Sequence, residues 1–141
     1  MSKDVRTDNA QQLEVLVSNP KDTPPHWITK LYICTGYAIT ELKGESDAKD
    51  TVESVRFWVG PAGRNIKCLE AIATGSLAYV HNAGGWSNGA FRVGPVNALW
   101  DLAKDQVQVT ADVATRDSDG WLYDIAYQVF ILVQEPDSEK E

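Results

Sequence analysis

Apolar and polar residues alternate with a period of two along several stretches of this chain, and this pattern restricts what it can fold into. In 52–59, Val55 and Phe57 fall on one face, whereas Arg56 and Trp58 fall on the other. A period of two is typical of a β-strand with one face toward a core. Stretches containing Gly and Pro separate these runs and are typical of turns. We therefore expect strands at 12–18, 27–42, 52–59, 65–74, 76–80, 106–115 and 121–134.

The last expected strand, 121–134, differs from the others because it becomes apolar on both faces toward its end. Trp121, Tyr123 and Ile125 begin one period-two face, and Phe130 and Leu132 add apolar side chains to the other. Strands that are apolar on both faces are usually covered on both faces. This pattern predicts a central strand of a sheet or a contact between subunits.

About seven short strands with turn residues between them predict an all-β fold: a single-domain antiparallel β-sandwich or a small barrel. A parallel α/β sheet would need crossover helices. Only 96–104, which follows Pro95, has apolar residues at helical spacing, so we expect at most one short helix there. A length of 141 residues fits one domain. We expect the β-sandwich domain to span 12–134, with a polar N-terminal arm at 1–11 and an acidic C-terminal tail at 135–141.

Charge and hydropathy narrow the class of partner. The net charge of −7 argues against nucleic acid or an anionic membrane surface as the main partner. No apolar run is long enough for a transmembrane segment, and the first residues lack the apolar core of a signal peptide. We expect a cytoplasmic protein, or one released without a signal peptide. Cys34 and Cys68 are too few for a disulfide scaffold, so they are either two thiols or one bridge between neighbouring strands.

One motif resembles a catalytic pattern. Gly85-Trp86-Ser87-Asn88-Gly89 fits Gly-x-Ser-x-Gly, in which a strand delivers a serine nucleophile to a tight turn before a helix. Here the preceding residues are loop-like and a strand-like segment follows. His26 and His81 both precede Ser87, the reverse of the order in that fold. Phosphate-binding loops and convergent metal ligands are also lacking, so we expect no metal and no cofactor.

Trp86 is the residue that most favours a binding function. It lies in a loop of glycines, amides and a hydroxyl with few apolar neighbours, whereas Trp58, Trp100 and Trp121 lie in patterns typical of core residues. An aromatic ring with short polar groups around it suits the apolar face and the hydroxyls of a sugar. In the alternative interpretation, Trp86 folds back and covers the core. The candidate ligand-binding residues are Trp86, His81, Asn82, Ser87, Asn88 and Arg92.

Three functions remain open at this point. The first is a cofactor-free, lectin-like protein that binds a small carbohydrate or glycan through the loop at 81–92. The second is a self-assembling structural subunit, such as that of a virion, tube or inclusion body, and a homo-oligomer is expected in either case. The third is a cofactor-independent enzyme with a β-barrel pocket, using His81, Ser87 and tyrosines. An enzyme is the least favoured of the three.

Overall fold

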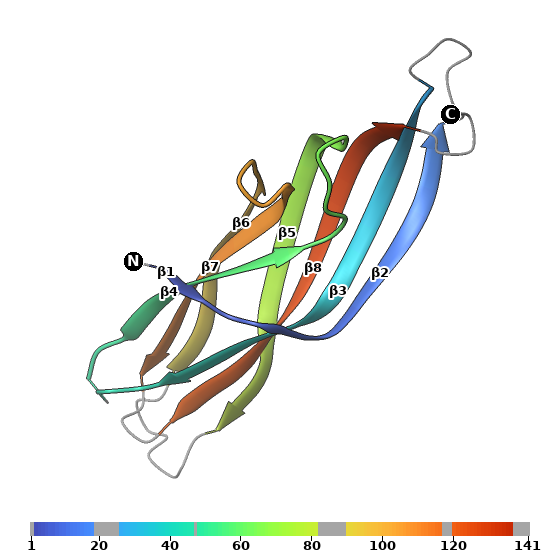
Figure 1. The fold of residues 1–141 in the computed structure, drawn as a ribbon. Coiled ribbons are helices and arrows are strands. Elements are labelled where there is room, and N and C mark those ends of the chain that lie inside the picture. The colour runs from blue at the N-terminus through green and yellow to red at the C-terminus, as the bar shows by residue number, and fades with distance from the viewer. Residues whose placement is uncertain (1, 19–25, 47, 82–89, 117–119, 137–141) are drawn as a thin grey trace.

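The computed structural model of the chain describes residues 2–18, 26–46, 48–81, 90–116 and 120–136, and these ranges hold eight β-strands. The strands form two four-stranded sheets (Figure 1). Sheet A has the order β1-β4-β7-β6, and sheet B has the order β2-β3-β8-β5. The strands are β1 (Ser2–Asp4), β2 (Thr7–Ser18), β3 (Trp27–Lys43), β4 (Thr51–Val59), β5 (Lys67–His81), β6 (Ala90–Asp101), β7 (Gln106–Arg116) and β8 (Trp121–Pro136).

The two sheets form a sandwich rather than a closed barrel, which confirms the predicted all-β class. All strand pairs are antiparallel except β1 with β4, which are parallel. The N-terminal segment passes from one sheet to the other (Figure 1). At this crossing the Val5 amide donates to the Arg56 carbonyl, and the Ile39 amide donates to the Arg6 carbonyl. The described residues contain no helix capable of spanning a membrane.

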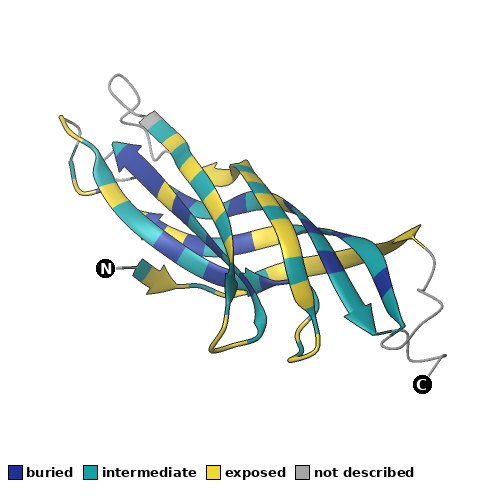
Figure 2. Cartoon of the chain, turned by 90° about the horizontal axis from the view of Figure 1, so that it is seen from above, coloured by how far each residue is buried: buried dark blue, intermediate teal, exposed yellow. Residues whose placement is uncertain are grey.

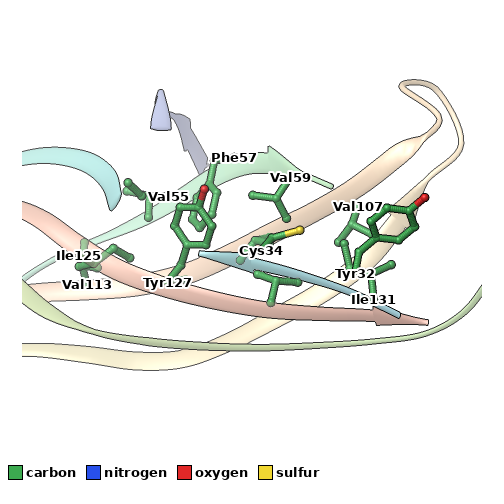
Figure 3. Close-up of a cluster of buried hydrophobic side chains, with 14 of the residues drawn as sticks. Tyr32, Cys34, Val55, Phe57, Val59, Val107, Val113, Ile125, Tyr127 and Ile131 are labelled. Carbon is green, nitrogen blue, oxygen red and sulfur yellow. The ribbon is translucent and has the colours of Figure 1, made fainter. Parts of the chain in front are cut away.

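The core lies between the sheets and follows from the alternation in the sequence. Buried residues alternate with more exposed ones along β3, β4, β7 and β8 (Figure 2). Phe57 from sheet A and Tyr127 from sheet B meet at the centre, with ring centroids 5.0 Å apart (Figure 3). The buried side chains around them are mostly valines and isoleucines, which suit a pleated surface with one face covered.

β8 is a central strand, between β3 and β5, as its two-sided apolar pattern predicted. Gly36 of β3 lies close to the Tyr127 side chain of β8. A Cβ atom there would lie 2.6 Å from the Tyr127 hydroxyl oxygen. The two runs expected at 65–74 and 76–80 form one continuous strand, β5, with Gly75 inside it.

Two expectations are corrected. The segment 96–104 is not helical, because β6 continues to Asp101 and pairs with β7. Val96, Ala98 and Trp100 alternate toward the core, and this period of two outweighs the helical spacing. Pro95 lies in an irregularity of register on an edge strand, where no ladder N–H is required. The polar segment 1–11 is not a free arm throughout, since residues 2–4 and 7–11 belong to β1 and β2.

Candidate functional site

The predicted ligand-binding loop is only partly described. Asn82, Trp86, Ser87 and Asn88 all fall in 82–89, outside the described residues, so neither the exposure of Trp86 nor a reactive Ser87 is tested. The other two candidates lie on the strands that flank this segment. His81 is the exposed last residue of β5 in sheet B, and Arg92 lies near the start of β6 in sheet A.

Arg92 is already engaged in an ion pair. Its guanidinium Nη2 contacts the Asp50 carboxylate, which lies in the connection between β3 and β4. His81 and Arg92 therefore come from different layers of the sandwich, and Arg92 is tied to a third segment. His81, in contrast, lies beside an aromatic residue, because it pairs in register with Trp121 of β8.

Three aromatic rings adjoin the end of β5, and we call them the aromatic cluster: Tyr79, Trp121 and Tyr123. Trp121 and Tyr123 are stacked, with centroids 5.5 Å apart and an angle of 5° between the ring planes. Tyr79 meets Tyr123 edge to face at 5.1 Å. Tyr79 is 56% exposed, while Trp121 and Tyr123 are half-buried. Such offset and edge-on contacts hold rings in fixed orientations.

The aromatic cluster points away from the core, which corrects the expectation that Trp121 and Tyr123 share a face with Ile125. Leu122, between them, is fully buried, and so is Ile125. The strict alternation is therefore broken between Tyr123 and Ile125. The partner strand β3 is irregular in register here, between Ile39 and Leu42. A change of this kind turns one set of side chains to the other face of a strand.

The irregularity in β3 contains its own strained residue. Glu41 has a φ of 46°, in the left-handed region that non-glycine residues rarely occupy. The neighbouring Thr40 is fully buried, and its Oγ1 donates to the Leu122 carbonyl at 2.8 Å. This hydrogen bond joins the irregular part of β3 to the strand that carries Trp121 and Tyr123. It therefore supports the backbone from which the aromatic cluster projects.

Trp58, another tryptophan of the described part, is held by its neighbours on sheet A. Trp58 lies on the outward face of sheet A, where its indole N–H donates to Asp101 at 2.9 Å. The cationic groups of Arg56 and Lys104 lie 5.1 and 4.2 Å from its ring centroid. The hydrogen bond from Trp58 lowers the pKa of Asp101. Trp58 is therefore not a core residue as expected, and its ring is engaged by neighbouring side chains.

A separate feature, a cleft, lies at the edge of the sandwich between β2 and β4. The cleft has a volume of about 310 Å³, and its lining includes Gln11, Gln12, Cys34 and Tyr127. Gln106 of this cleft donates through Nε2 to the Gly60 carbonyl at 2.9 Å. Sequence reasoning did not identify this cleft, because it depends on the irregular pairing of β2 with β3 between Asp8 and Gln11.

The groups in the cleft are unsuited to nucleophilic chemistry. Burial raises the pKa of the Cys34 thiol to about 11, so it stays protonated at neutral pH. Burial also raises the pKa of Tyr127. Cys34 and Cys68 are both free thiols.

Within the described ranges, no three His, Cys, Asp or Glu side chains gather as they would around a metal ion.

The chain matches no protein-family model, no curated protein and no solved structure. In the described residues, the aromatic cluster beside His81 combines exposed ring area, fixed orientation and a position next to the predicted loop.

Proposed function

We propose that this chain is a carbohydrate-binding protein that works without a cofactor, with its site at the end of the sandwich that carries residues 81–92. The observation that supports this proposal is the aromatic cluster. Tyr79, Tyr123 and Trp121 project from sheet B beside His81, the first residue of the predicted binding loop 81–92.

The chemistry of the cluster suits a sugar better than a charged ligand. A ring face can cover the C–H groups of a pyranose, and the tyrosine hydroxyls and the imidazole can exchange hydrogen bonds with its hydroxyls. None of the three rings of the aromatic cluster carries a permanent charge, so the rings themselves do not select an anion. In the sequence of the loop, Asn82, Ser87 and Asn88 would add short polar groups around Trp86.

The compartment is part of the same proposal. We propose that the protein acts in the cytoplasm, or after release without a signal peptide. Two free thiols, one of them buried, fit synthesis in a reducing compartment.

A glycan array probed with the full chain tests the proposal, followed by titration of the best glycan. Tyr79→Ala and Trp86→Ala should each weaken binding by about 1–3 kcal/mol, as the loss of an aromatic anchor commonly does. Leu99→Ala is the matched control, because Leu99 is also exposed and apolar but lies on β6 in sheet A. Its affinity should equal that of the parent chain.

Two results would contradict the proposal. One is the absence of binding to any glycan on the array. The other is binding that survives both aromatic substitutions, which would place the sugar elsewhere, such as in the amide-lined cleft. A Gln12→Ala variant distinguishes that case, because Gln12 lines the cleft and is absent from the aromatic cluster.

A further inference from the structure

The outward face of sheet B is covered by nothing in the described chain, and its side chains form ordered rows. Strand register aligns one residue from each of β2, β3, β8 and β5 in every row. Two adjacent rows are apolar almost throughout. They are Leu13, Ile33, Phe130 and Ile72 in one row, and Val15, Leu31, Leu132 and Glu70 in the next.

The two central strands stay uncharged beyond these two rows. The row that follows is Gln11, Thr35, Gln128 and Thr74, all polar and uncharged. The central strands β3 and β8 carry no charged residue at any outward position between Thr29 and Tyr37 or between Ala126 and Gln134. The outward positions of β3 from Thr29 to Tyr37 define five rows, and the charged residues of these five rows lie on the edge strands only: Asp8, Lys67 and Glu70.

The charges near one end of sheet B lie on its opposite side. Glu14 and Glu135 both form ion pairs with Lys30. The Tyr32 hydroxyl also donates to Glu135 at 3.1 Å, and Tyr32 points inward. These groups therefore leave the central strands of the outward face without charge, in a chain whose net charge is −7.

The apolar side chains of this face are more exposed than is usual for a monomeric protein. Leu13 is 59% exposed and Ile72 is 57% exposed, at opposite edges of the same row. Single exposed apolar residues are ordinary, but continuous apolar patches of several hundred square ångströms usually mark an interaction site. With strands about 4.8 Å apart and residues about 3.3 Å apart, the five rows have a flat footprint of roughly 500–600 Å². The accessible area of such a ridged surface exceeds its footprint, which brings it near the ~800 Å² per partner of a specific interface.

We propose that this face binds the same face of a second copy of the chain, giving a two-fold symmetric dimer with two sheets B packed together. A twisted sheet is covered well by another sheet at about 30°, and a second copy supplies that shape and the same apolar rows. The distribution of charge also favours this face as the contact between two copies. Two copies of charge −7 repel each other, and this is where they meet with no charge at the centre.

Sedimentation of the full chain from low to high micromolar concentration tests the proposal. The parent chain should be a dimer, and Ile72→Glu and Leu13→Glu should each weaken dimerisation about a hundredfold or more, because each buries an unpaired acid in the interface. Val52→Glu is the matched control. Val52 is 59% exposed, like Leu13, but lies on β4 in sheet A, so this variant should dimerise as the parent does.

Circular dichroism of each variant separates loss of dimer from loss of fold, and both test positions are exposed enough to accept an acid. A parent chain that is monomeric at high micromolar concentration overturns the proposal. So does a dimer that Leu13→Glu disrupts and Ile72→Glu does not, since that result indicates pairing of β2 edges. Binding of the monomer to neutral phosphatidylcholine vesicles would overturn it in favour of a lipid surface. None of these results depends on glycan binding.

Discussion

At the scale of single residues, the absence of a side chain at Gly36 leaves room for the Tyr127 ring in the core. A Cβ atom at this position would lie 2.6 Å from the Tyr127 hydroxyl oxygen and 2.9 Å from its Cζ atom. The Tyr127 ring cannot easily move away, because it packs against Phe57 with centroids 5.0 Å apart. Glycine is therefore required here by space, since its φ is not in the left-handed region.

We predict that Gly36→Ala destabilises the fold by about 1–3 kcal/mol, the usual cost of overpacking a core. Urea denaturation measures the effect. Gly63→Ala is the control, because its nearest contact, Ile66 Cδ1 at 3.5 Å, is an ordinary van der Waals distance. Adding Tyr127→Phe to Gly36→Ala should recover part of the loss, since it removes the closest atom. Equal stability of the parent and Gly36→Ala would show that the ring adjusts freely.

At the scale of elements, the irregular part of β3 is held by a buried threonine. Thr40 and Thr115 are both fully buried, but their hydroxyls differ. Thr40 Oγ1 donates to the Leu122 carbonyl at 2.8 Å. Thr115 Oγ1, on β7, has no hydrogen-bond partner among the described residues. A buried polar group with a partner stabilises the fold, and one without a partner costs free energy.

These two threonines give a matched pair of valine substitutions. Thr40→Val should lower the free energy of unfolding by about 1–2 kcal/mol, because it removes a buried hydrogen bond. Thr115→Val should leave it unchanged or raise it by about 1 kcal/mol, because it removes an unpaired hydroxyl. Denaturant unfolding monitored by tryptophan fluorescence compares them. The same sign for both variants would contradict the assignment of the hydrogen bond.

Some strands of the fold can be predicted from the sequence and others cannot. Alternation identifies β4, β7 and most of β8, because one of their faces is buried and the other is not. It misses the end of β6, because Leu99 and Leu102, which follows the strand, have helical spacing although both are exposed in the structure. The aromatic cluster is also missed, because the face of β8 changes opposite an irregularity in β3. That change depends on another strand, and no local pattern records it.

The candidate site was predictable only in outline. His81 could be selected from sequence because it precedes a loop rich in glycine and amides. Its neighbour Trp121 lies 40 positions away and becomes adjacent only through the pairing of β5 with β8. Tyr79 joins the cluster by the same pairing, through an irregular register at Leu77–Val80. The pairing of β5 with β8 therefore brings together aromatic residues that are far apart in the sequence.

At the scale of the whole molecule, the net charge of −7 opposes association, while the apolar rows on the outward face of sheet B favour it. With charges of −7 about 30 Å apart in water, the screened Coulomb repulsion is about 2–3 kcal/mol at 0.01 M salt and a few tenths at 0.15 M. We therefore predict that the dimer tightens roughly tenfold or more over this range, measured by sedimentation equilibrium in sodium chloride. An interface held by ion pairs would weaken instead, because salt screens attraction as it screens repulsion. A dimer that loosens with added salt would thus place the contact on a charged surface and not on the apolar rows of sheet B.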